Sequence, residues 1–369
     1  MAAALTGAGV TFASAVLARK ALQSPRETSA SEALPVTVLR PIKGAEPGLE
    51  EALWSALEQD YPGEVQVVCG IEEAEDAAGA VVRDLQCRAP DRDVHLVAGG
   101  HIEGANRKIA NLSHMLTAAK HDLLIVADAD IVVPAAWLWA AVSTLSRPAV
   151  GLVTCYYVGE GLTAWGRVLA MGTSYQFLPN AVLGVATGLA QPCFGSTIAF
   201  RHETLAQIGG FERFRNSLAD DREIGDAVRR NGFAVAYPRL LVRHLSAERT
   251  LRELWGHELR WARTVRTANP LGYLGSIITY PLPLALIGAI LGGFSWPALV
   301  MLAAVMATRL FLKSRIDHIA GFRAGPAWLL PVRDLLSFGV FLNSLVGRTV
   351  DWRGTQYRID EHGAISQGG

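Results

Sequence analysis

Two aspartates separated by a single residue, Asp128 and Asp130, follow an apolar run at residues 123–126 that has the composition of a buried β-strand. Carboxylates at this spacing are able to approach one divalent cation that also binds phosphate oxygens. Such a cation, Mg²⁺ or Mn²⁺, would neutralise a departing diphosphate. Aspartates at strand ends are also common turn and helix-cap residues, so the pair indicates a metal site mainly through its position after a fully apolar strand.

A second acidic pair, Asp220 and Asp221, opens an amphipathic helical stretch. Asp221 is a candidate general base, because a carboxylate there could accept the proton of an attacking hydroxyl. Attack by that oxygen at an anomeric carbon would invert its configuration. Asp220 is interpreted as a helix cap or as a partner of Asp221. Upstream, the small residues of 193–197 and 209–211 allow either close approach of the backbone to a ligand or ordinary turns.

A third polar cluster is the sequence His-Glu-Leu-Arg-Trp at 257–261, in a predicted helix directly before an apolar segment. Arg260 could bind a diphosphate bidentately, and Trp261 could stack on an acceptor or on a sugar face. An Arg/Trp cluster beside a membrane segment also serves as an interfacial anchor. Both interpretations of these residues stay open from the sequence.

The elements that must position these residues alternate between strands and helices, which predicts an α/β domain over 35–268 with a mostly parallel sheet and helices on both faces. The predicted strands are 36–39, 64–69, 94–97 and 123–126, and the predicted helices are 49–57, 76–87 and 106–119. Ligands of such sheets bind at the carboxyl ends of the strands. Polar residues expected at those ends are Arg40, Lys43, Glu72, Glu73, Asp128 and Asp130.

The composition indicates that part of the chain lies in lipid, because 50% of the residues are hydrophobic and only 18% are charged. A net charge of zero gives no reason to expect nucleic acid as a partner. The four cysteines are far apart and lack the close pairs of a zinc or redox motif. We interpret them as reduced thiols.

Apolar segments long enough to span a bilayer occur at the two ends of the sequence. Residues 1–20 are predicted to form an uncleaved transmembrane anchor. The basic residues that follow the apolar part, Arg19, Lys20 and Arg26, favour a cytoplasmic location for the catalytic domain and therefore an inner-membrane, multi-pass protein.

The C-terminal region 271–346 is predicted to be membrane-associated. Residues 271–294 and 297–312 form a helical hairpin broken at Ser295 and Trp296. The stretch 328–346 contains Arg333 and Asp334, which are costly in lipid unless they are paired, so it either spans or lies in the interface. The tail, 347–369, is predicted to be cytosolic.

The three clusters occur in this order between hydrophobic ends, and the chain resembles the ceramide glucosyltransferase group of family 2-like glycosyltransferases (family 21 type). Three further stretches carry the resemblance, namely Leu-Arg-Pro-Ile-Lys-Gly at 39–44, Asn-Arg-Lys-Ile-Ala-Asn-Leu at 106–112, and Asp-Trp-Arg-Gly-Thr-Gln-Tyr at 351–357. A bacterial branch, the hopanoid-biosynthesis-associated glycosyltransferases, is more similar. It shares Phe-Gly-Ser-Thr at 194–197 and the pattern His-x-Leu-Arg-Trp-Ala-Arg-Thr at 257–264.

The resemblance implies a GT-A-like nucleotide-sugar fold and a role for each matching residue. Asp221 corresponds to the presumed base and Asp128 to the family's second aspartate. Residues implied at the donor side are Pro41, Lys43, Glu73, Lys108, Asp128, His257, Arg260 and Trp261. The chain departs from the family where Glu73 replaces the first aspartate, where His257 replaces Gln or Arg, and where Tyr175 stands in place of a histidine.

These observations predict a membrane-bound inverting transferase that moves a sugar from UDP-glucose or UDP-N-acetylglucosamine to a lipid hydroxyl. The acceptor is a hopanoid alcohol or a ceramide, and glucosylceramide synthesis proper is the alternative. Residues 162–185, interrupted by Pro179, are either an acceptor-side interfacial element or core. One alternative is a processive synthase, which would need a pore, and the trailing apolar segments are few for that. Another alternative is a non-catalytic membrane scaffold, which would explain the departures at Glu73 and His257.

Overall fold

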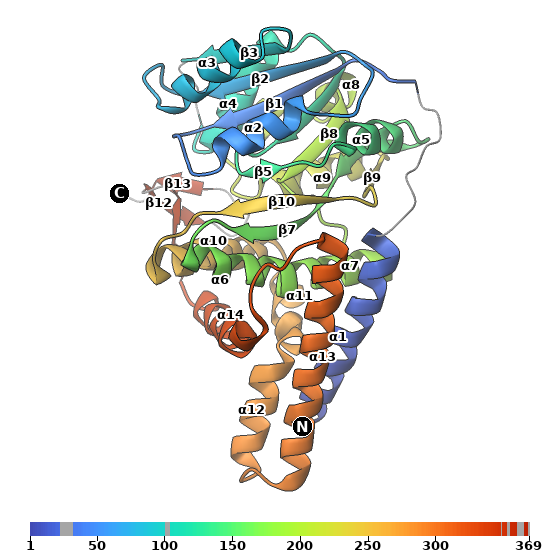
Figure 1. The fold of residues 1–369 in the computed structure, drawn as a ribbon, viewed down its shortest axis with the longest axis vertical. Helices are drawn as coiled ribbons and strands as arrows, with labels where there is room; N and C mark the ends of the chain where they lie inside the picture. The colour runs from blue at the N-terminus through green and yellow to red at the C-terminus, as the bar shows by residue number, and fades with distance from the viewer. Residues whose placement is uncertain (23–31, 100–103, 348, 353–354, 360–364, 368–369) are drawn as a thin grey trace.

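The computed structural model describes residues 1–22, 32–99, 104–347, 349–352, 355–359 and 365–367. Arg26 of the predicted anchor flank, and Arg353 and Gly354 of the 351–357 motif, lie outside these ranges. The described residues form an α/β domain from which a bundle of apolar helices projects (Figure 1).

The central sheet of the described residues confirms the predicted α/β class. Its spatial order is β3 (Asp93–Ala98), β2 (Val65–Ile71), β1 (Val36–Ile42), β4 (Leu123–Ala127), β8 (Thr197–Arg201), β6 (Val150–Thr154) and β9 (Ala234–Ala236). Strands β1 to β4 are mutually parallel, whereas β8 is antiparallel to both of its neighbours. The sheet is therefore mostly parallel, with one reversed strand after the parallel half.

Alternating apolar residues bury both faces of this sheet, because successive strand side chains point to opposite sides. In β4, Leu123, Ile125 and Ala127 pack in one buried cluster, while Leu124 and Val126 pack in the other. The first cluster is covered by α2 (Leu49–Leu57), α3 (Ala78–Arg88) and α5 (Trp137–Leu145). The second is covered by α4 (Arg107–Met115), α8 (His202–Gln207) and α9 (Asp220–Arg230). The short helix η1 (Leu116–Ala118) extends α4, and η3 (Phe211–Phe214) precedes α9.

A smaller sheet lies between the central sheet and the apolar helices and has the order β5 (Ile131–Val132), β10 (Leu241–Ser246) and β7 (Tyr156–Gly161). Three helical segments follow β7, namely α6 (Ala164–Gly172), the π-helix η2 (Thr173–Phe177) and α7 (Leu178–Thr187). Pro179 does not break this run, because it occupies the first turn of α7. These helices share a buried cluster with α1 and α13, so residues 162–185 form the joint between the sheet and the bundle.

The bundle consists of α1 (Ala2–Leu22), α12 (Pro281–Leu291) and α13 (Trp296–Ala320), which pack on one another. Among the described residues, α1 and α13 are each long and apolar enough to cross a membrane. The predicted run 271–294 is not one straight helix. It divides into α11 (Pro270–Gly275), η4 (Ser276–Thr279) and α12, with a 65° bend where Pro281 starts α12.

The break predicted at Ser295 and Trp296 is shifted, because Trp296 already belongs to α13 and the turn precedes it. The predicted segment 328–346 contains η5 (Ala327–Leu329) and α14 (Leu330–Ser344). Both ends of α14 contact α10 (Leu251–Ala268), which follows the smaller sheet. Arg333 pairs with Glu258, and Arg266 donates to the carbonyl of Ser344. Helix α14 thus runs along the domain (Figure 1).

Two arginines of the C-terminal region, Arg309 and Arg333, pair with carboxylates, as buried charges in an apolar bundle require. The Arg309 guanidinium donates two hydrogen bonds to the Asp334 carboxylate and a third, of 2.8 Å, to the carbonyl of Tyr175. Beyond α14, the tail forms a small antiparallel sheet of β11 (Thr349–Trp352), β12 (Thr355–Ile359) and β13 (Ile365–Gln367). Its Val350 and Tyr357 pack on Leu218, just before the second acidic pair.

Candidate active site

The first acidic pair lies where β4 ends at the carboxyl edge of the sheet. Lys108 of α4 contacts Asp128, with 2.6 Å between Nζ and Oδ1. The other carboxylate has a different neighbour, because Asp130 Oδ2 lies 3.4 Å from Nε2 of His244 on β10. Its second oxygen, Oδ1, is buried and has no hydrogen-bond partner in the described part of the chain.

The acidic pair fits a hard divalent cation. Within the described ranges, no three His, Cys, Asp or Glu side chains gather as a complete metal cluster. The orphaned Asp130 Oδ1 is nevertheless a free oxygen ligand, and Asp128 is close in sequence. Such a site suits an ion that takes one or two carboxylates and completes its coordination with substrate phosphates.

The second acidic pair starts α9 and divides into two roles. Asp221 accepts hydrogen bonds from backbone N–H groups, from Gly195 to Oδ2 at 2.9 Å and from Arg222 to Oδ1 at 2.7 Å. Asp220 does not cap the helix, since Ala219 is the capping residue and makes no side-chain cap. Asp220 instead accepts a 3.1 Å hydrogen bond from Asn106 Nδ2. The helix-cap role is therefore wrong, and the role of Asp220 as a partner of Asp221 stays a prediction.

The Asn106 to Lys108 stretch joins the two acidic pairs. Asn106 caps α4 through Ile109 N–H and also donates to the carbonyl of Ser217, which fixes the loop before α9. Lys108 Nζ lies 2.6 Å from Asp128 and 4.0 Å from Asp220 Oδ2. One ammonium group therefore compensates carboxylates that come from two distant parts of the sequence.

Asp221 and Asp130 have different pKa values because their environments differ. Burial, followed by the charge of Asp220, raises the pKa of Asp221 to about 6, although Lys108 opposes this. Burial would also raise the pKa of Asp130, but the adjacent His244 outweighs it and lowers that pKa to about 2. A carboxylate with a pKa near 6 is mostly ionised at neutral pH and still basic enough to take a proton.

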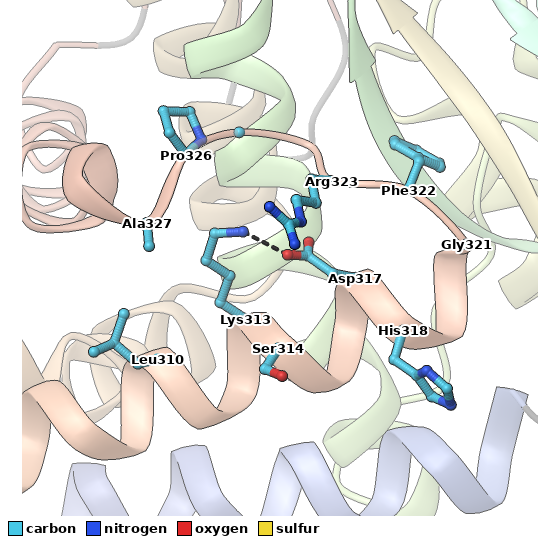
Figure 2. A pocket seen from close by; sticks show the side chains of 11 residues that line it. Leu310, Lys313, Ser314, Asp317, His318, Gly321, Phe322, Arg323, Pro326 and Ala327 are labelled. Carbon is cyan, nitrogen blue, oxygen red and sulfur yellow. Dashed lines mark hydrogen bonds and ion pairs between the residues drawn. The ribbon is translucent and has the colours of Figure 1, made fainter.

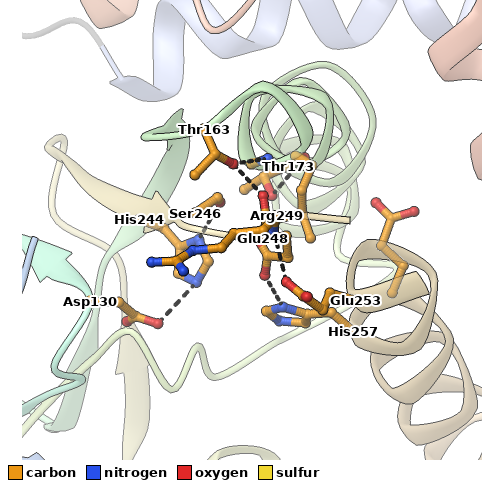
Figure 3. A network of polar contacts seen from close by, with 12 residues as sticks. Asp130, Thr163, Thr173, His244, Ser246, Glu248, Arg249, Glu253 and His257 are labelled. Atoms are coloured by element: carbon orange, nitrogen blue, oxygen red, sulfur yellow. Dashed lines mark hydrogen bonds and ion pairs between the residues drawn. The ribbon is translucent and has the colours of Figure 1, made fainter. Parts of the chain in front are cut away.

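The His-Glu-Leu-Arg-Trp cluster of α10 lies at the same site. His257 Nδ1 contacts Glu248 Oε1 at 2.6 Å, and its ring lies 4.3 Å from Trp261. Trp261 in turn lies 5.7 Å from the ring of His244, measured between centroids. Figure 3 shows two neighbouring sets of polar contacts, in which Asp130 contacts His244 and Glu248 contacts His257. Arg260 follows one helical turn after His257 on the same helix.

The donor-side residues predicted after the first two strands lie at the same sheet edge. Their side chains are more exposed than those of the acidic pairs. Lys43 and Glu73 follow the ends of β1 and β2 and have exposed side chains. Pro41 lies within β1, opposite Gly70. The expectation for Arg40 is wrong, because β1 continues to Ile42. Arg40 is fully buried within the strand, where it donates to the carbonyl of Ile131.

Sequence reasoning missed three residues that the fold brings to the site. His244 and Glu248 come from β10 and the loop after it, and Tyr157 comes from β7. Burial, with Asp221 as the next cause, raises the pKa of Tyr157. A histidine inside the apolar strand 241–246 was the available signal for His244. Tyr175, in contrast, points away from the acids and donates to Asp317 of α13.

The fold and the paired acids together define a GT-A-like glycosyltransferase. The structure is similar to a mannosyltransferase from Pyrobaculum calidifontis, solved with GDP-mannose and Mn²⁺, with a TM-score of 0.54 and 22% identity over 93% of this chain and 98% of that one. At this identity the likeness concerns the fold. The family model of glycosyl transferase family 21 matches residues 1–365, and the chain belongs to that family.

Among curated proteins, the chain is 24% identical to ceramide glucosyltransferase 1 of Caenorhabditis elegans, over 89% of this chain and 72% of that protein. It is 34% identical to the ceramide glucosyltransferase of Komagataella phaffii over 116 residues, which cover 30% of this chain. That alignment spans only 23% of the yeast protein's length.

Proposed function

We propose that this protein transfers a hexose or N-acetylhexosamine from a UDP-sugar to a lipid hydroxyl, with inversion, at the cytoplasmic surface of the inner membrane. The observation that carries the proposal is Asp221, a carboxylate whose pKa is raised to about 6 and which Lys108 links to the first acidic pair, Asp128 and Asp130. The relatives described above include ceramide glucosyltransferases, which supports a lipid acceptor.

The residues of the chain have separate tasks in this hypothesis. Asp128 and Asp130 would hold a divalent cation, which when bound neutralises charge on the leaving diphosphate. Lys43, Glu73 and Lys108 contact the nucleotide side of the donor. Pro41 shapes the wall next to them. Together these residues would hold the anomeric carbon of the donor sugar in position for attack by the acceptor hydroxyl.

Asp221 takes the proton of the lipid hydroxyl as its oxygen forms a bond to the anomeric carbon. The bond from that carbon to the diphosphate oxygen breaks with its electron pair, so UDP leaves from the opposite face and the configuration inverts. Arg260 binds the diphosphate, while Trp261 and His257 close the acceptor side. Backbone N–H groups that bind the Asp221 carboxylate hold it in place for this transfer.

A lipid acceptor is supported by the position of the site above the bundle. Helix α14 has exposed apolar side chains, among them Val332 at 54% and Leu335 at 43%, and its other face packs on the domain. We infer that α14 lies in the interface, so that the tail stays on the cytoplasmic side. A headgroup could then reach Asp221 without leaving the bilayer.

The donor and the acceptor are proposed as pairs to be tested, UDP-glucose with ceramide and UDP-N-acetylglucosamine with a hopanoid alcohol. The chain's Phe-Gly-Ser-Thr motif, whose Gly195 contacts Asp221, favours the hopanoid pair through the resemblance stated above. A processive synthase is less well supported, because the described residues hold two candidate spans, or three if the bent pair is one.

The test is UDP release by the full-length protein in lipid vesicles, with each donor and acceptor. Asp221→Asn is expected to lower turnover by about 10²–10⁴-fold, the range of general-base catalysis. The matched control is Asp226→Asn, on the same helix but paired with Arg229 at the surface. Unchanged turnover in Asp221→Asn would refute the base assignment. An unmodified protein that turns over no donor with any lipid would favour a non-catalytic scaffold.

A further inference from the structure

A cavity of about 700 Å³ lies apart from the acidic pairs, between the C-terminal half of α13 and the loop that follows it. Its polar lining comes from Lys313, Ser314, Asp317, His318 and Arg323. Figure 2 shows Lys313, Asp317 and Arg323 directed into the same space. The volume is within the range of small-ligand sites.

The charges in this cavity leave one cation in excess. Lys313 is buried, and its ammonium contacts Asp317 Oδ2 and the hydroxyl of Tyr175. The other oxygen of Asp317 accepts the hydroxyl hydrogen of Tyr175. Both carboxylate oxygens are thus engaged, so Asp317 is neutralised by Lys313. Arg323 is exposed and, within the described ranges, has no ion-pair partner.

A bilayer placed by the length of α13 puts the cavity at the depth of lipid headgroups. A hydrocarbon core of about 30 Å corresponds to about 20 helical residues at 1.5 Å each. Trp296, 77% exposed, starts α13 and has the character of an interfacial anchor at the far side. About 20 residues counted along α13 from Trp296 place the other edge of the hydrocarbon core close to Ile316. Leu310 therefore lines the cavity at acyl-chain depth, and Arg323 lines it at headgroup depth.

A contact path leads from the cavity to the candidate active site. Tyr175 belongs to η2, a π-helix, and such segments occur often at functional sites. In the same segment, the Phe177 ring lies 4.7 Å from Tyr157 and 5.6 Å from Phe194. Phe194 directly precedes Gly195, whose N–H group binds the candidate base.

We propose that this cavity binds the phosphate headgroup of an anionic phospholipid, with Arg323 as its main contact, and that the bound lipid activates the enzyme through Tyr175. The site is distinct from that of the acceptor lipid. Its net positive charge selects the anionic headgroup over a zwitterionic one, and its apolar wall selects a lipid over free phosphate. The activating role rests on the proposed transferase function, whereas the binding does not.

Binding is tested by native mass spectrometry of the full-length protein taken from detergent with phosphatidylglycerol, phosphatidylcholine or inorganic phosphate. The unmodified protein is expected to retain phosphatidylglycerol preferentially. Arg323→Gln should weaken its retention about tenfold, the factor for one charge-assisted hydrogen bond. The matched control is Arg315→Gln, which removes a cation of the same helix end outside the cavity lining and should stay within about twofold.

Equal retention in Arg323→Gln and unmodified protein would overturn the proposal, as would equal retention of phosphatidylcholine. Retention of inorganic phosphate in place of the lipid would show that the occupant is not a lipid. The second arm compares kcat/KM in vesicles with and without phosphatidylglycerol. Stimulation of the unmodified protein and Arg315→Gln but not of Arg323→Gln is expected. Equal stimulation of all three would remove the activating role, while the binding arm stands independently of turnover.

Discussion

Replacing Lys108 should move the pH dependence of turnover upward. Lys108 Nζ lies 4.0 Å from Asp220 Oδ2 and 2.6 Å from Asp128 Oδ1, and its charge lowers the pKa of Asp221. At an effective dielectric of 20, opposite unit charges 4 Å apart interact by about 4 kcal/mol. No direct contact joins Asp221 and Lys108, so we expect a smaller interaction, on the order of 1.4 kcal/mol. That is about one pKa unit.

In Lys108→Gln, the acidic limb of kcat/KM should therefore move from about pH 6 to about pH 7. The assay is UDP release between pH 5 and 9 at subsaturating donor. The position of the limb is the readout, because loss of a donor contact would lower the whole profile without shifting it. Arg107→Gln is the matched control. It removes the adjacent cation, which pairs with Glu72 away from the acids, and should leave the limb unmoved. A limb that stays in place or moves downward in Lys108→Gln would refute the electrostatic account.

Three further predictions concern stability and the metal. Because the folded-state pKa of Asp221 is raised to about 6, its ionisation destabilises the fold as pH rises from about 4 through 6. Asp221→Asn should thus raise the thermal unfolding midpoint at pH 7.5, and the two proteins should converge near pH 4. Gly172→Ala would drive a methyl group into the Arg333 guanidinium and displace it from Glu258, so its midpoint should fall, whereas Gly9→Ala, with open space, should be nearly neutral. Chelation by EDTA should abolish UDP release and added Mn²⁺ should restore it; activity that survives chelation would refute the metal assignment.

The sequence predicted the elements whose signals are local. Four apolar runs became β1 to β4, and the helix predicted at 49–57 has those bounds in the structure. Asp128 and Asp221 could be placed from the sequence because the first follows a predicted strand and the second starts a predicted helix. The assignment of catalytic roles to these residues stays a prediction.

The parts that sequence did not reveal depend on contacts between distant segments. His244 reaches Asp130 because β10 pairs with β5 in a second sheet, and no local periodicity encodes that pairing. Arg40 looked like a strand-end residue because Pro41 follows it, yet the strand continues through the proline. The sequence indicates that Asp334 needs a partner, but it does not identify Arg309 as that partner. The two residues lie 25 positions apart on different helices.

The joint between the sheet and the bundle has a consequence for biogenesis. Helix α1 packs on α13, and their shared cluster includes Ala15, Ala18 and Leu312. The ribosome must therefore synthesise almost 300 further residues before the first helix meets its main partner. At 5–20 residues per second this delay is roughly 15 to 60 s. During that time the small-residue face of α1, a candidate membrane span, has no partner helix, so we expect an insertase to shield it.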